Sequence, residues 1–169
     1  MRRTSTTLSA AGVSNWIPLN THAINPTVGL AVVLNSTGNL TYDVEHTFSD
    51  LANVQDITIS RTTTTATVTH VAHGLVTGDC SVIMNTGTTN FDGNRTVTVT
   101  DADTYTFTCA NSGVTTASGK AVPLNVFNHG TLAAQTTSQD GVYDAPISAC
   151  RLNVTAYTAG NATLHVIPQ

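Results

Sequence analysis

Residues 40–48 read LTYDVEHTF, and this stretch decides the fold class. One alternating set is mostly apolar and comprises Leu40, Tyr42, Val44, His46 and Phe48. The other set is polar and comprises Thr41, Asp43, Glu45 and Thr47. A period of two residues is typical of a β-strand with one buried face, whereas a helix repeats every 3.6 residues. We therefore expect a strand here, with Glu45, the only glutamate, on its solvated face.

The same alternation recurs along the chain, at residues 104–109, 150–157 and 162–166. Threonine and valine, which favour a pleated and half-buried surface, supply much of it. Turn residues such as Gly, Asn and Asp separate the runs. The pattern predicts an all-β protein of about ten to twelve strands, built as a β-sandwich or barrel. At most one short helical turn is expected, near residues 49–53.

Composition excludes several function classes. Only 9% of residues are charged, the net charge is −4, and five arginines and one lysine are the only strong bases, so the chain lacks the basic face of a general nucleic-acid binder. The longest apolar run, residues 28–34, is far shorter than the roughly 20 residues of a membrane span. Two arginines near the N-terminus have no apolar segment after them, so we expect no signal peptide.

Threonine is distributed unevenly. More than half of the 33 threonines, and the single lysine, fall within residues 56–122. The flanking residues 1–55 and 123–169 are richer in Leu, Asn and Pro and hold the only tryptophan, Trp16. We therefore expect a discontinuous β-sandwich domain, residues 1–55 and 123–169, with a Thr-rich β-barrel-like module inserted at residues 56–122, because exposed loops tolerate insertions.

Two histidines have a spacing that binds metal on a helix. His70 and His73 are three residues apart in a Thr/Val run that enters a Gly turn. On a strand this spacing places them on opposite faces, so we expect no metal site. His73 and Asp79 are expected to hydrogen-bond to the backbone of their turns.

Three aspartates lie close together in the same region. Asp101 and Asp103 flank one alanine, and Asp92 precedes a glycine. Clustered carboxylates can bind Ca²⁺ or act as an acid–base pair, but between two strands they usually accept hydrogen bonds from turn amides. No phosphate-binding loop, dinucleotide fingerprint or nucleophile elbow occurs. We expect no catalytic, cofactor-binding or metal-binding residue, and no enzyme activity.

The cysteines and the N-terminal segment complete the candidate features. The three cysteines are odd in number and widely spaced, which predicts buried free thiols and no disulfide: Cys80, Cys109 and Cys150. Residues 4–11 are small and polar, so we expect this arm to become ordered only against a neighbouring subunit. Two interpretations of Trp16 remain open, which are an anchor on a neighbour and ordinary packing in its own chain.

Three stretches carry a family resemblance: residues 73–79 (HGLVTGD), 91–99 (FDGNRTVTV) and 101–107 (DADTYTF). They resemble a small β-barrel-like module that recurs in structural proteins of tailed bacteriophages. The flanks also look like a phage virion protein, at residues 16–19, 28–34, 40–48, 140–143 and 151–160. In that family the module is structural, so the resemblance implies a particle component and no catalytic residues.

The sequence thus favours a capsid decoration (cement) protein that binds between major capsid subunits. We expect a homo-oligomer, with a trimer favoured because decoration proteins often sit on local threefold axes, located on the capsid surface of a virion assembled in the host cytoplasm. No direct contact with nucleic acid or membrane is expected. A small tail or head-to-tail connector component is one alternative. A displayed module that binds host glycans is another, although 5% aromatic residues are few for both a core and a sugar platform.

Overall fold

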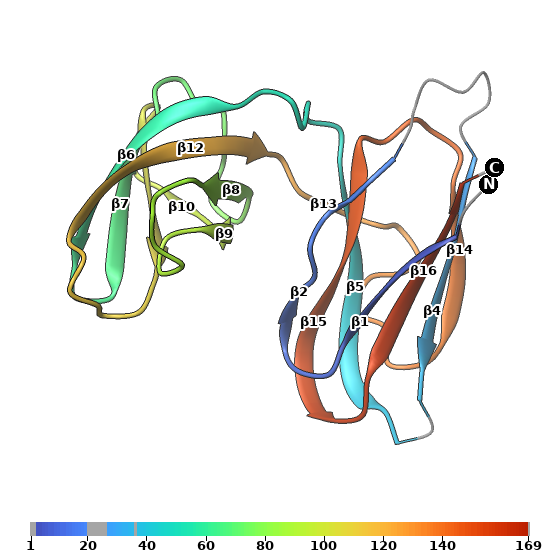
Figure 1. Ribbon diagram of the computed structural model, residues 1–169. Coiled ribbons are helices and arrows are strands. Elements are labelled where there is room, and N and C mark those ends of the chain that lie inside the picture. The colour runs from blue at the N-terminus through green and yellow to red at the C-terminus, as the bar shows by residue number, and fades with distance from the viewer. Residues whose placement is uncertain (1–2, 20–26, 36, 169) are drawn as a thin grey trace. The chain divides into compact units, whose positions relative to one another are not determined.

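The computed structural model describes residues 3–19, 27–35 and 37–168 (Figure 1). Every regular element in these residues is a β-strand, so the predicted all-β class is confirmed. The described residues include no helix with the length and apolar character of a membrane span. Residues 49–53 form a hydrogen-bonded turn in place of the expected helical turn: Asn53 N donates to Asp50 O at 3.1 Å, and Ala52 N to Asp50 Oδ1 at 2.8 Å.

The chain divides into two compact units. The sandwich unit comprises Met1–Phe48 and Phe127–Gln169, and the module comprises Ser49–Val126. The divisions therefore fall at 48/49 and 126/127, and not at the expected 55/56 and 122/123. Hydrogen bonds explain the wider module, since Asn125 N donates to Ser49 Oγ at 3.0 Å and Val126 N to Asp79 Oδ1 at 2.9 Å.

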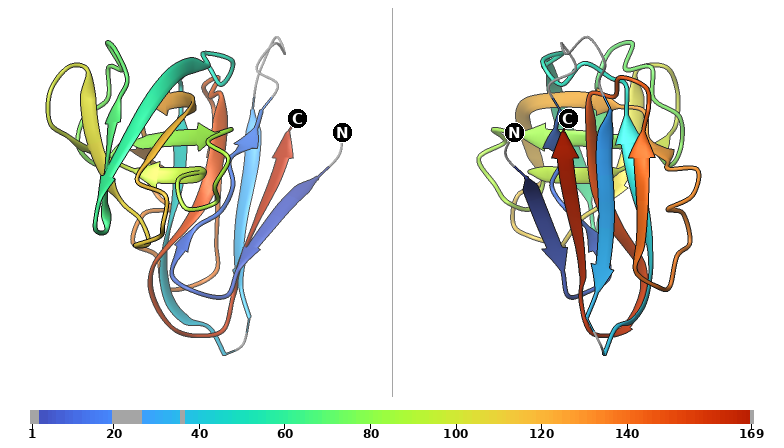
Figure 2. Two further views of the ribbon diagram at one scale, coloured as in Figure 1. Left: turned by 60° about the vertical axis from the view of Figure 1, so that its left-hand side comes forward. Right: turned by 90° about the vertical axis from the view of Figure 1, so that its right-hand side faces the viewer.

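Two antiparallel sheets form the sandwich unit. The first has the order β1-β16-β4-β14, seen side by side in the right-hand view of Figure 2: β1 (Thr4–Leu8), β16 (Ala162–Pro168), β4 (Val28–Leu34) and β14 (Gln139–Tyr143). The second has the order β13-β5-β15-β2, and β3 also pairs with β15: β13 (Phe127–Asn128), β5 (Asn39–Thr47), β15 (Ala149–Ala159), β2 (Gly12–Val13) and β3 (Ile17–Pro18).

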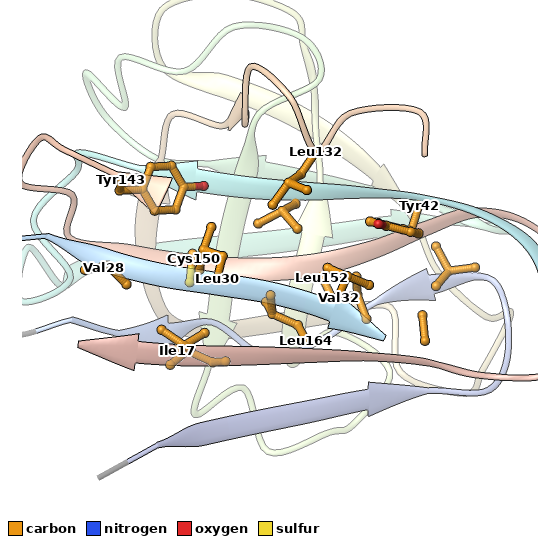
Figure 3. Packing of buried hydrophobic residues seen from close by; sticks show 14 of the residues in the cluster. Ile17, Val28, Leu30, Val32, Tyr42, Leu132, Tyr143, Cys150, Leu152 and Leu164 are labelled. Atoms are coloured by element: carbon orange, nitrogen blue, oxygen red, sulfur yellow. The ribbon is translucent and has the colours of Figure 1, made fainter. Parts of the chain in front are cut away.

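Side chains from both sheets fill one core (Figure 3). Leu30, Val32 and Leu164 come from the first sheet, and Tyr42 and Leu152 from the second. Full burial of side chains of this size stabilises a fold by roughly 1.5–3 kcal/mol each. The alternating residues of β4, β5, β15 and β16 therefore produce the sandwich that the sequence pattern predicts.

The N-terminal arm differs from its expectation. β1 is a strand of the protein's own sheet and pairs antiparallel with β16 from Thr4↔Val166 to Leu8↔Ala162. Leu8 packs against the sandwich core, which adds apolar contact to the backbone ladder. The expectation that this segment orders only against a neighbour is therefore wrong.

One antiparallel sheet of seven strands forms the module. Its order is β10-β11-β7-β6-β12-β8-β9: β6 (Gln55–Thr62), β7 (Thr65–Thr69), β8 (Cys80–Met84), β9 (Gly93–Thr96), β10 (Thr98–Val99), β11 (Thr104–Thr108) and β12 (Thr116–Leu124). The strands at the two ends of this order, β9 and β10, are separated by Val97 alone. The sheet must therefore curl back on itself, which gives a barrel-like module around a core of its own that includes Ile59, Phe91 and Tyr105.

Candidate interaction surface and buried polar clusters

Glu45 is buried, contrary to the expectation of a solvated position. Arg151 Nε donates to Glu45 Oε2 at 2.6 Å, and the two side chains are 3% and 9% exposed, respectively. Asn153 Nδ2 donates to the other carboxylate oxygen at 2.7 Å. The register of β5 against β15 places Arg151 directly opposite Glu45. Glu45 is therefore buried in an ion pair whose other member lies more than 100 residues away in the sequence, on the neighbouring strand.

Trp16 belongs to the same cluster. Its ring lies 4.4 Å from Arg151 Cζ, a cation–π contact on the outer face of the second sheet. β2 and β3, on either side of Trp16, both pair with β15, so they hold the tryptophan over this strand. Of the two interpretations, packing within its own chain is the one that the structure shows. The cluster of Glu45, Arg151, Asn153 and Trp16 is a structural clamp.

Five rings at the β13 side of the sandwich form a continuous group, here named the aromatic cluster: His46, Phe48, Phe127, His129 and Tyr143. His46 lies at its centre, with centroid distances of 5.2 Å to Phe48, 5.8 Å to Phe127 and 5.0 Å to Tyr143. The two phenylalanine rings lie 5.8 Å apart. The pairing of β13 with β5 sets Phe127 opposite His46 and so assembles the group.

The exposed part of this cluster is apolar. Phe48 is 54% exposed and Phe127 is 49% exposed, while His129 and Tyr143 are buried. Burial, followed by the charge of His129, lowers the pKa of His46, which favours its neutral form. The alternation in residues 40–48 predicts a buried Phe48, but β5 ends at Thr47 and the ring beyond it remains half exposed. The sequence carries no signal for Phe127, which reaches the cluster only through strand pairing.

His70 and His73 lie close together, contrary to the expectation of opposite faces. Their ring centroids are 6.0 Å apart, and each also contacts the ring of Tyr105. β7 ends at Thr69, and Ala72 has a φ of +51°, in the left-handed region, so the chain turns between the two histidines. No group of three or more metal-ligating side chains occurs within residues 3–19, 27–35 and 37–168.

Each of these histidines has a structural role. Leu75 N donates to His73 Nδ1 at 3.0 Å, so Nε2 carries the proton and donates to Asp101 O at 3.1 Å. The prediction that His73 bonds to turn backbone is confirmed. His70 is 1% exposed and its Nε2 lies 3.1 Å from Gln55 Oε1. Burial, followed by the charge of His73, lowers the pKa of His70.

The aspartates of the module accept hydrogen bonds from turns, as predicted. Asp101 accepts from Asp103 N at 2.8 Å and from the Thr104 hydroxyl at 2.6 Å. These bonds, the hydroxyl first, lower the pKa of Asp101. Asp92 Oδ1 accepts from both the backbone N and the hydroxyl of Thr86, at 3.1 and 2.8 Å. The carboxylate oxygens are thus engaged by the protein itself.

Asp79 also has the turn role expected for it. Its Oδ2 accepts from Val76 N at 2.9 Å, and its Oδ1 accepts from Val126 N. One carboxylate therefore ties its own turn to the end of the module's chain. All three cysteines of the described residues are buried, and none forms a disulfide: Cys80, Cys109 and Cys150.

The surface of the module carries an open hollow of about 390 Å³ on β6, β7 and β12. Its walls are mainly hydroxyl and aliphatic, including Thr58, Thr69, Val71 and Ser118. Asp56 lines it as well, and is paired with Lys120 Nζ at 2.7 Å. The carboxylate at this hollow is therefore engaged by the lysine.

Comparison with known proteins identifies no family. No family model matches the chain, and no curated protein matches it. Among solved structures, the chain is similar to an endosialidase of phage phi92, at 25% sequence identity over 71% of this chain and 21% of that one, with a TM-score of 0.32. The chain thus spans about a fifth of the length of that enzyme. A likeness at this TM-score carries neither fold nor activity across, so the function is argued from the chain's own residues.

Proposed function

We propose that the protein is a structural component of a tailed-phage particle, and that it acts as a capsid decoration protein. In this proposal it sits on the capsid surface as a homo-oligomer, binds between major capsid subunits and performs no catalysis. The resemblance of residues 73–79, 91–99 and 101–107 to a phage structural module supports the particle role. The observation that carries the adhesive role is the aromatic cluster of the sandwich unit.

The aromatic cluster has the properties of a protein-binding surface. Phe48 and Phe127 present two half-exposed rings side by side, held from beneath by His46. Aromatic side chains dominate the energetics of interfaces because they bury much apolar area and lose little conformational entropy. His46 is the neighbouring titratable ring, and burial keeps it largely uncharged at neutral pH. The surface therefore offers apolar contact with little charge to desolvate.

The low charge of the whole chain fits the same role. With 9% charged residues, binding to a shell is expected to depend weakly on salt, since screening acts mainly on exposed charges. A ligand that binds the assembled shell and not its dissociated subunits stabilises the shell by mass action. Many copies on one particle turn modest single-site affinity into strong attachment.

The test uses particles stripped of the protein and then resupplied with it. Wild-type protein is expected to rebind at both low and high salt and to raise the temperature at which the particles rupture. The double variant Phe48→Ser/Phe127→Ser is expected to lose binding. A matched control, Val33→Ser/Ile167→Ser, removes two other exposed apolar side chains, 47% and 45% exposed, and is expected to bind normally.

Copy number separates the alternatives. Hundreds of copies per particle support decoration, whereas a dozen or fewer indicate a tail or connector component. Binding of the wild type, but not of the phenylalanine variant, to a glycan array would show that the cluster recognises sugars. Stripped particles that are as heat-stable as complete ones would refute the cement role.

A further inference from the structure

The free edge of β1 has an unusual composition for an edge strand. β1 (Thr4–Leu8) lies at one end of the order β1-β16-β4-β14, with β16 on one side, as the right-hand view of Figure 2 shows. Its sequence is TSTTL, without charge, proline or glycine. Proteins usually protect such edges with charges, proline, bulges or very short strands, because an open row of N–H and C=O groups pairs readily with another strand.

The strands at the other ends of the two described sheets differ from β1 in composition or length. β14, at the opposite end of the same sheet, carries Asp140 and Gly141. The edge strands of the second sheet, β13 and β2, have two residues each. β1 is thus the edge whose length and composition suit pairing.

We infer that β1 is a self-association edge, where it pairs antiparallel with β1 of a second copy about a twofold axis through Thr6. This inference concerns the chain alone and does not rest on the capsid role. It predicts pairs in place of the trimer expected from sequence. The two four-stranded sheets would join into one sheet of eight strands.

The residues of β1 complement themselves in this register. With Thr6 on the axis, all five residues pair: Thr6 with its copy, Ser5 with Thr7 and Thr4 with Leu8. A twofold axis at Thr6 thus gives every residue of β1 a partner in the second copy. β1 has no charged side chain, so the contact carries none of the like-charge repulsion that destabilises cross-strand pairs.

On each face of the joined sheet, side chains of the second copy would lie beside side chains of β1 that already contact the first copy's own sheet or core. On the outer face, Thr7 Oγ1 lies 2.8 Å from Thr163 Oγ1, and a second copy would add the Ser5 hydroxyl beside Thr7. On the core face, Leu8 is only partly buried and packs at the margin of the core. The second copy would place Thr4 beside Leu8 and cover its open side.

Charge variants on the exposed positions provide the first test. Ser5 and Thr7 are exposed, so their substitution leaves the sandwich core intact. Ser5→Lys/Thr7→Lys places like charges opposite each other twice across the axis, whereas the matched Ser5→Lys/Thr7→Glu places opposite charges there. In sedimentation across a dilution series, the wild type and the Lys/Glu variant are expected to form dimers. The Lys/Lys variant is expected to have a dissociation constant about tenfold or more higher than the Lys/Glu variant.

Disulfide trapping tests the register. Thr6→Cys places the new thiol next to its own copy on the axis and is expected to form a covalent dimer on mild oxidation. Thr4→Cys places it opposite Leu8 and is expected to remain monomeric in denaturing gels. The native cysteines are buried and do not compete. Unchanged circular dichroism in each variant shows that the fold persists.

Three outcomes would overturn the inference. They are a wild type that remains monomeric or forms trimers, equal dissociation constants for the two charge variants, and cross-linking of Thr4→Cys as fast as that of Thr6→Cys.

Discussion

Removal of the Arg151 guanidinium by Arg151→Met is expected to destabilise the sandwich unit strongly. The side chain is 3% exposed and donates to Glu45 Oε2 at 2.6 Å, and its partner is 9% exposed. Without Arg151, the Glu45 carboxylate stays buried and keeps the hydrogen bond from the neutral Asn153 Nδ2, at 2.7 Å, but loses its charged partner. Breaking a buried pair by removing one partner costs about 3–5 kcal/mol. Since domains are stable by roughly 5–15 kcal/mol, this is a large part of the total.

Urea unfolding followed by Trp16 fluorescence measures this loss. Trp16 is the only tryptophan, and its ring lies 4.4 Å from Arg151 Cζ, so the signal reports the sandwich unit and this cluster. The double variant Glu45→Leu/Arg151→Met removes both charges. It is expected to recover most of the lost stability, because a well-packed apolar pair of similar volume often replaces a buried ion pair without loss.

An exposed ion pair of nearly the same length is the control. Lys120 Nζ lies 2.7 Å from Asp56 Oδ1, but the two side chains are 46% and 88% exposed. Lys120→Met is expected to change the unfolding free energy by less than about 1 kcal/mol, measured by far-UV circular dichroism. If Arg151→Met also costs less than about 1 kcal/mol, or if the double variant is as unstable as the single one, burial does not determine the strength of this pair and the reasoning fails.

Three further predictions concern the module and the thiols. Because burial lowers the pKa of His70, the unfolded chain binds more protons than the folded one as the pH falls below about 6.5. Calorimetry should therefore show that the module loses stability on acidification, and that it loses less in His70→Gln. An identical pH dependence in the two proteins would contradict this. Tyr105→Phe removes the 2.7 Å hydrogen bond to the buried Ser81 hydroxyl and is expected to lower the unfolding free energy by about 1–2 kcal/mol in the same assay. Addition of Ser81→Ala to this variant should lower it little further. Additive losses from the two substitutions would show that the hydrogen bond is not the cause. A thiol reagent is expected to find no reactive cysteine in the native protein and three after denaturation, because Cys80, Cys109 and Cys150 are all buried. Burial also raises the pKa of Cys150 to about 12, which disfavours its reactive thiolate form. A count of one thiol after denaturation without reductant would reveal a disulfide between two of them.

Local sequence patterns predicted the parts of the protein that depend on near neighbours. The two-residue alternation of residues 40–48 is a property of an extended backbone, so the strand and the all-β class follow from it. Asp101 accepts a hydrogen bond from the amide two residues ahead, and His73 accepts from Leu75 N, also two residues ahead. Interactions over such short separations are encoded in the residues themselves.

Only the tertiary structure decided what the alternating faces meet. The sequence places Glu45 on a polar face, but the register of β5 against β15 places Arg151 opposite it, 106 positions along the chain. The aromatic cluster likewise forms because β13 pairs with β5 and brings Phe127 beside His46. A period of two tells which residues share a face and does not tell which strand lies alongside or what covers that face. Those are set by strand pairing and core packing over the whole chain, and so the clamp, the aromatic cluster and the place of β1 in the sheet became visible only in three dimensions.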